Sequence, residues 1–179
     1  MNDEYLIRID KPRIEQTCDA YFKWKDLNTY VKSLVTRGIN IPDAISEPMG
    51  CYCLDLLWNK STGGDAQSAD GRKIEFKATS NYGYDLSSFG PKCDFDDLVF
   101  LRFDLDFNML YVYDTGVNSD ELKQLPVSRT ATLGEYQNAG KRPHISIIQT
   151  IIEARNLKPT VVFDIRRAKI VEKQWKAEC

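Results

Sequence analysis

The chain has one histidine, no CxxC cysteine pair and no long apolar run. A lone histidine excludes zinc hydrolases with several histidine ligands and nucleases built on a His-Asn-His core. The five cysteines are odd in number and irregularly spaced, which argues against a zinc site and predicts reduced thiols. No stretch approaches the ~20 apolar residues of a membrane span, and residues 1–10 are too short and too charged for a secretory signal. We therefore expect a cytoplasmic protein without a membrane partner.

The apolar content is sufficient for one core, because hydrophobic residues make up 42% of the 179 residues. We expect a single domain over residues 1–179. The net charge of −2 by itself argues against a nucleic-acid partner. Residues 123–176, however, contain 11 Lys and Arg against 4 Asp and Glu. This basic C-terminal third suits phosphate binding, although an ordinary fluctuation of charge explains it equally well.

The most informative stretch is residues 63–80, GGDAQSADGRKIEFKATS, which is typical of a β-hairpin. Asp70-Gly71 tolerates the left-handed backbone angles that a two-residue turn demands. Along the second strand, side chains alternate between faces, so one face is apolar and the other polar. The apolar face carries Ile74, Phe76 and Ala78. The polar face carries Glu75, Lys77 and Thr79.

The polar face brings acids and a base together. Glu75 and Lys77 stand roughly 7 Å apart along the strand, and Asp65 lies across the hairpin after two glycines. Two carboxylates that face one point form a hard-oxygen site for a cation such as Mg²⁺. Lys77 beside them can hold an attacking water or neutralise charge on a phosphate. A hairpin with solvated charges is the structural alternative, but it does not need small neighbours, and the chain has Gly63, Gly64, Ala66 and Ala78 there.

The residues of this hairpin resemble the active-site residues of a known group of enzymes. Asp65-Ala66, followed by Ile74-Glu75-Phe76-Lys77-Ala78-Thr79, resembles the active-site hairpin of the PD-(D/E)xK nuclease superfamily. A wider set of segments resembles the small type II restriction endonucleases of the Bsp type, namely Ile45-Ser46-Glu47, Trp58-Asn59-Lys60, Gly63-Gly64-Asp65-Ala66, residues 74–81 and Ser88-Phe89-Gly90-Pro91. The resemblance covers about residues 40–165, and the first forty residues add little to it. It implies an α/β fold with a restriction-endonuclease-like core, a mixed β-sheet flanked by helices on both sides.

The resemblance also implies Mg²⁺-dependent hydrolysis of phosphodiester bonds in double-stranded DNA. Asp65 and Glu75 would then bind the metal with the backbone carbonyl of Phe76, and Lys77 would orient the water. A short GC-rich interrupted palindrome is the family's expected site, which implies a homodimer that matches the two-fold symmetry of the DNA. A restriction enzyme further requires a cognate DNA methyltransferase, encoded separately, to protect the host.

Glu47 is a further candidate, because the family pattern often adds a helical acid to the catalytic group. Its neighbour Pro48 removes a backbone hydrogen bond, so Pro48 either directs Glu47 towards the site or marks the start of the helix. An exposed, ion-paired glutamate is the structural alternative.

Periodicity and turn residues predict the remaining elements. They are an arm or edge strand in residues 1–13, a helix over 14–37 stopped by Gly38, a helix within 42–60, a polar loop over 81–95, strands at 98–104 and 109–114, a short helix from Ser119 ended by Pro126, a helix over 146–157 and a last strand at 161–165.

Residues 127–143 are polar and basic with little periodicity, which is typical of a recognition or clamp segment and not of a core element. An arginine can donate two hydrogen bonds to one guanine edge, and lysines bind phosphate. A lone histidine is structural in most proteins, with a DNA contact as its functional alternative. The candidate DNA contacts are Arg129, Gln137, Lys141, Arg142 and His144.

Two other functions stay open from the residues alone. A different PD-(D/E)xK nuclease, such as a junction resolvase or a repair nuclease, would share the hairpin and would act on branched or nicked DNA. A DNA-binding module that has lost catalysis is disfavoured, because Asp65, Glu75 and Lys77 are all present in register.

Overall fold

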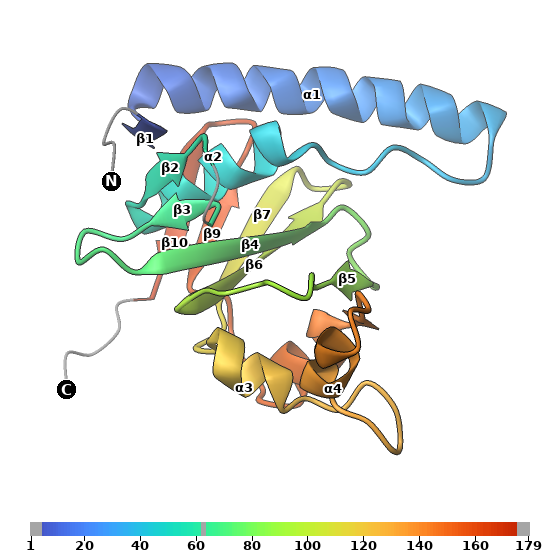
Figure 1. Ribbon diagram of the computed structural model, residues 1–179. Helices are drawn as coiled ribbons and strands as arrows, with labels where there is room; N and C mark the ends of the chain where they lie inside the picture. Colours follow the sequence, from blue (N-terminus) through green and yellow to red (C-terminus); the bar gives the residue numbers. More distant parts are fainter. Residues whose placement is uncertain (1–4, 62–63, 175–179) are drawn as a thin grey trace.

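The computed structural model describes residues 5–61 and 64–174, and most of its strands form one mixed sheet (Figure 1). The strands are β1 (Leu6–Arg8), β2 (Leu57–Asn59), β3 (Ala66–Gln67), β4 (Lys73–Thr79), β5 (Ser87–Ser88), β6 (Asp97–Asp104), β7 (Met109–Asp114), β8 (His144–Ile145), β9 (Val161–Asp164) and β10 (Lys169–Lys173). Eight of them form the large sheet in the order β1-β2-β3-β4-β6-β7-β9-β10. β4 and β6 are parallel, whereas the other neighbours in this sheet are antiparallel. β5 and β8 pair separately.

Helices cover both faces of the large sheet (Figure 1). On one face lie α1 (Lys11–Leu34) and α2 (Asp43–Leu54), and on the other lie α3 (Ser119–Lys123), α4 (Leu133–Asn138) and the π-helix η2 (Ile148–Glu153). Each face has its own cluster of buried apolar side chains. The predicted α/β architecture, a mixed sheet with helices on both sides, is confirmed. Within the described residues, none of these helices combines the length and apolar composition needed to cross a bilayer.

β6 is covered on both faces, as its near-continuous apolar sequence predicts. Leu98 and Phe100 belong to the cluster beneath α3 and α4, whereas Val99 and Leu101 belong to the cluster beneath α1 and α2. β6 is parallel to its neighbour β4, and this constrains the chain that connects the two strands. Parallel neighbours need a connection that returns along the whole strand, and residues 80–96 make this return without a helix. The connection therefore passes close to the polar face of β4.

The first helix is shifted by three residues towards the N-terminus: it spans 11–34, whereas the predicted range is 14–37. Asp10 caps it by accepting a hydrogen bond from the backbone N–H of Arg13 at 2.9 Å, and Pro12 fits the first turn. Gly38 lies beyond the helix, where the chain turns back against it. A Cβ at Gly38 would come within 2.2 Å of the Asn28 Oδ1 atom, which also accepts a hydrogen bond from the Ile39 N–H at 2.8 Å. Glycine at this position thus allows the returning segment to close onto α1.

Of the next two helices, the first lies within its predicted range of 42–60 and the second differs from its predicted bounds. α2 runs without interruption from Asp43 to Leu54, so Pro48 lies inside it and does not mark its start. The helix predicted over 146–157 is the short π-helix η2. Asp85 occupies its entrance, where its carboxylate accepts hydrogen bonds from the backbone N–H groups of Ile147 and Ile148 at 2.9 and 3.0 Å.

Several elements lie where the sequence pattern predicts no such element, namely α4, β10 and the short strands β2, β5 and β8. α4 falls inside the segment 127–143, and a reciprocal capping box between Thr132 and Glu135 starts it. Its Leu133 is fully buried, so part of this segment belongs to the core. β10 follows β9, which makes the predicted last strand the penultimate one. β10 is an edge strand with mostly exposed residues, so it lacks the apolar signal by which strands are recognised.

The contact between α2 and β4 predicts a large cost for a small substitution. A Cβ at Gly50 would lie 2.7 Å from the Cε1 atom of Phe76 and 3.2 Å from the Cδ1 atom of Leu101. We expect Gly50→Ala to lower the free energy of unfolding by about 1–3 kcal/mol, because overpacking outweighs the better helix propensity of alanine. Urea denaturation measures the change. Gly83→Ala is the matched control, since a Cβ there meets no atom within 4 Å; equal stabilities of the two variants would contradict the prediction.

Candidate active site

The hairpin β3–β4 brings Asp65 next to the second strand. Ala66 pairs with Ile74 and Gln67 with Lys73, and the Asp65 N–H donates to the carbonyl of Ile74 at 3.0 Å. Gly64 adopts φ +107° immediately before Asp65, an angle that favours glycine. Gly63 lies outside the described residues.

The turn of this hairpin is longer than predicted. The Ser68 N–H donates to the carbonyl of Arg72 at 3.0 Å, which leaves residues 69–71 as the loop in place of a two-residue turn. Gly71 has φ +87°, so the expected left-handed glycine is present. A three-residue loop with glycine in this conformation is a common hairpin connection.

Asp65, Glu75 and Lys77 lie together, as the strand alternation predicts. The Asp65 Oδ2 atom accepts a hydrogen bond from the Phe76 N–H at 2.7 Å. The Lys77 Nζ atom donates to the Glu75 Oε1 atom at 2.5 Å, and the two side chains are only 23% and 18% exposed. The three charged groups are therefore half-buried and interact electrostatically.

The negative charge of this cluster exceeds its positive charge, and burial makes ionisation harder. Burial and, next to it, the neighbouring Glu75 carboxylate raise the pKa of Asp65 to about 6, whereas the hydrogen bond from the Phe76 amide and the charge of Lys77 lower it. Burial also raises the pKa of Glu47 to about 7, against the hydrogen bond that the Trp58 Nε1 atom donates to its Oε2 atom at 2.8 Å. Asp65 and Glu75 add to the shift at Glu47. Glu47 is thus partly buried within the electrostatic reach of the hairpin carboxylates, and its partner is a tryptophan and not a basic side chain.

The oxygen atoms at this position fit a hard divalent cation. In a strand, the N–H and C=O of one residue point to the same edge, so the carbonyl of Phe76 faces the edge on which Asp65 lies. β3 pairs with β4 only at Lys73 and Ile74, so Phe76 lies beyond the paired part. Within residues 5–61 and 64–174, there is no group of three or more His, Cys, Asp or Glu side chains that could bind a metal ion. Two carboxylates and a carbonyl suit Mg²⁺, which usually keeps several waters and uses one or two carboxylates.

The returning connection 80–96 adds two neighbours that the sequence analysis did not include. The Lys77 Nζ atom lies 5.4 Å from the centre of the Phe89 ring, a cation–π distance. Burial raises the pKa of the Cys93 thiol to about 11, and the nearby Glu75 carboxylate adds to this shift. Phe89 and Cys93 become visible as site residues only when β4 and β6 are known to be parallel.

A groove of about 810 Å³ runs along residues 76–81 of β4 and the chain after it. One wall comes from residues 37–43, between α1 and α2, and the other from residues 84–88 with His144. Asp85 fixes the second wall, because it accepts hydrogen bonds from Ser87 and Ser146 at 2.9 and 2.7 Å besides its bonds at η2. Lys77 lines this groove and Asp65 and Glu75 do not, so the groove meets the candidate active site at Lys77.

Comparison with known proteins identifies the class of enzyme. The family model described as Bsp6I restriction endonuclease matches residues 9–154. The type II restriction enzyme Bsp6I of Bacillus sp. (strain RFL6) is 44% identical over 168 residues, which are 93% of this chain and 97% of that enzyme. The chain belongs to the Bsp6I restriction endonuclease family. It is accordingly a type II restriction enzyme, a site-specific deoxyribonuclease. This assignment replaces the alternatives of a junction resolvase or a repair nuclease. The similarity also includes most of the first forty residues, which were expected to add little.

In this restriction enzyme, the candidate DNA contacts do not form one group. His144 is exposed on β8 opposite Ser88 and lines the groove with Lys77. Arg142 is exposed, and its guanidinium packs near Gly90. Lys141 lies over the ring of Tyr136 at 5.4 Å. Arg129 is exposed in the loop between α3 and α4, outside the groove lining.

Gln137 differs from the other candidates. It is 6% exposed, and its Nε2 atom donates to the carbonyl of Gly90 at 2.7 Å. In this conformation α4 turns the side chain inward, where it supports the loop beside the candidate active site.

The raised pKa of Glu47 predicts a pH-dependent stability of the metal-free enzyme. The folded state holds the Glu47 proton up to about pH 7, whereas the ordinary pKa is 4.5. Stability contributed by this residue is therefore lost as the pH rises through that window. We expect the free energy of unfolding of Glu47→Gln to equal that of the wild type near pH 4 and to be higher than that of the wild type above pH 7. The glutamine can still accept the hydrogen bond from Trp58.

Urea denaturation in chelator, across this pH range, measures the difference between the two proteins. Glu153→Gln, at an exposed position of η2, is the control for loss of a carboxylate. A difference between Glu47→Gln and wild type that stays constant with pH would contradict the prediction.

Proposed function

We propose that this restriction enzyme is a PD-(D/E)xK nuclease that uses Mg²⁺ to cut double-stranded DNA at a short GC-rich interrupted palindrome. The observation that carries the proposal is the cluster of Asp65, Glu75 and Lys77 at the unpaired edge of β4. The resemblance of the hairpin sequence supports the same assignment. Asp65, Glu75 and the Phe76 carbonyl would hold Mg²⁺, which supplies positive charge and makes water a better nucleophile when bound.

Lys77 has the central role among the side chains. An ammonium group has three N–H donors, and one of them is bonded to Glu75. The others can hold the attacking water in line with the leaving oxygen and donate to a phosphate oxygen as its charge grows. Glu47, fixed by Trp58, supports the site by adding negative charge that favours a bound cation.

The groove beside Lys77 is the natural position for the DNA. Its second wall carries His144, and Lys141 and Arg142 precede His144 in the same segment. In the proposal these residues contact phosphates or bases, Arg129 reaches the DNA from outside the groove, and Gln137 acts by holding the Gly90 loop. In the cell, a separately encoded methyltransferase would protect the cytoplasmic DNA at the same site.

The direct test is incubation of the purified enzyme with unmethylated phage DNA, in Mg²⁺ and in chelator, beside Asp65→Ala. We expect discrete fragments that require both Mg²⁺ and Asp65, and the sequences of their ends give the site and the cut position. Fragments that persist in chelator, or with Asp65→Ala, would refute the proposed chemistry.

Lys77→Ala should separate catalysis from binding. We expect cleavage to fall by about 10²–10³-fold, the usual cost of losing one group that stabilises transition-state charge, while affinity for DNA stays near that of the wild type. Lys73→Ala is the matched control, because Lys73 is on the same strand and face but pairs with Asp94. Single-turnover cleavage and fluorescence anisotropy measure the two properties. Loss of folding with loss of binding would instead make Lys77 a structural residue.

A palindromic site predicts two copies of the chain on each DNA duplex, one active site per strand. Light scattering coupled to gel filtration, with a duplex that contains the identified site, should give a mass of two chains per duplex. A single chain per duplex that still cuts both strands would rule out the homodimer.

A further inference from the structure

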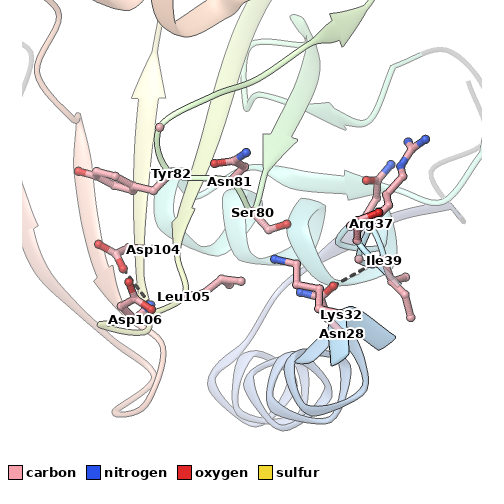
Figure 2. A pocket seen from close by; sticks show the side chains of 14 residues that line it. Asn28, Lys32, Arg37, Ile39, Ser80, Asn81, Tyr82, Asp104, Leu105 and Asp106 are labelled. Carbon is pink, nitrogen blue, oxygen red and sulfur yellow. Dashed lines mark hydrogen bonds between the residues drawn. The ribbon is translucent and has the colours of Figure 1, made fainter. Parts of the chain in front are cut away.

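A second hollow adjoins the groove, and the proposed function leaves it unused. It has a volume of about 580 Å³ and lies between the C-terminal half of α1, the chain after β4 and the turn between β6 and β7 (Figure 2). Four residues line both hollows, namely Arg37, Asn40, Ser80 and Asn81. A strand of DNA that lies beside Lys77 can therefore continue into the second hollow around the end of β4.

The α1 side of this hollow is cationic. Lys32 follows Asn28 by one helical turn, so both side chains face the hollow, as Figure 2 shows. Arg37 and Lys32 are both exposed. None of the ion pairs within residues 5–61 and 64–174 includes Arg37 or Lys32, whereas the cations Arg72 and Lys73 of the hairpin are paired. Their charges are available to an anionic ligand.

The opposite side of the hollow is acidic. Asp104 and Asp106 lie across from Lys32 (Figure 2). The Asp104 Oδ1 atom accepts hydrogen bonds from the N–H groups of Asp106 and Phe107 at 3.0 and 3.1 Å, so this carboxylate closes the turn. A phosphate would be repelled from this side and attracted to α1, which restricts an anionic strand to one wall.

The position of Arg37 is fixed by its neighbours. Gly38 packs against the Asn28 Oδ1 atom and the Lys32 side chain, and the same Oδ1 atom accepts the hydrogen bond from the Ile39 N–H. The backbone on the C-terminal side of Arg37 is therefore anchored to the buried Asn28 of α1. A cation on an anchored backbone loses less conformational entropy on binding than one on a free loop.

We propose that Arg37, assisted by Lys32, binds a phosphate of the DNA strand next to the cleaved bond, so that α1 extends the DNA-binding groove. This inference rests on the proposed function, because it requires DNA in the groove beside Lys77. Every nucleotide of a bound strand carries a phosphate, so neighbours of the attacked phosphate must lie along the groove. Arg37 lines the same groove as Lys77, and among the lining residues of the first wall it is the cation that can neutralise one of these phosphates.

The test compares Arg37→Ala, Arg37→Lys and Lys32→Ala with the control Lys23→Ala, whose residue is exposed on α1 outside the lining of the hollow. Anisotropy of a short fluorescein-labelled linear duplex, in chelator and over a series of salt concentrations, gives affinity and salt dependence. For Arg37→Ala we expect about tenfold weaker binding and a slope of log K against log salt reduced by about 0.9, the value for one phosphate contact. Arg37→Lys should retain the slope, and Lys32→Ala should show a smaller loss.

Two outcomes overturn the inference. If Arg37→Ala matches Lys23→Ala in affinity and slope, Arg37 does not touch DNA. If affinity falls with an unchanged slope, Arg37 contacts a base and not a phosphate. Failure of the proposed function is visible separately, as absence of Mg²⁺-dependent cleavage by the wild type. Thermal melting of each variant checks that the exposed substitutions leave the fold intact.

Discussion

The early end of the pairing between β3 and β4 is the constraint on which the active site depends. β3 contributes two residues to this pairing, so among residues 5–61 and 64–174 no strand pairs with this edge of β4 from Phe76 onwards. Asp65 uses this edge by accepting a hydrogen bond from the Phe76 N–H, which satisfies one of the donors that the edge leaves open. In the proposed function, the carbonyl of Phe76 and the carboxylates of Asp65 and Glu75 hold the cation beside this edge. A longer β3 would pair this edge completely and would leave no room for a cation or a phosphate.

The electrostatics of the site oppose the stability of the fold. Glu47, Asp65 and Glu75 are gathered in a half-buried region with Lys77 as the close basic partner, and burial raises the pKa of Glu47 and of Asp65. Such a cluster is unfavourable when all its carboxylates are ionised, so it binds either protons or a cation. This property distinguishes it from the exposed ion pairs of the same hairpin, such as Arg72 with Asp70, whose charges are solvated and balanced.

The sequence predicts the parts of this site that depend on neighbouring residues. Strand alternation places Glu75 and Lys77 on one face, and Asp-Gly marks the turn, because both rules act within a few residues. Phe89, Cys93 and the groove walls were not predicted, since they arise from the return connection between parallel strands. Helix α4, which buries Gln137, was not predicted because its local signal, the capping box of Thr132 and Glu135, was not recognised. β10 was not predicted because an exposed edge strand has no apolar pattern.

The two walls of the groove are anchored in the same way, although they come from opposite faces of the sheet. A buried polar side chain holds each one: Asn28 binds the segment after α1, and Asp85 joins the return connection to η2. A buried polar group that is fully hydrogen-bonded specifies geometry more sharply than apolar packing, because a misplaced partner leaves it unsatisfied. The walls are therefore positioned independently of the candidate catalytic carboxylates. Net charge is a poor guide to such a protein, because an overall negative chain can still present Arg37, Lys77 and His144 along one groove.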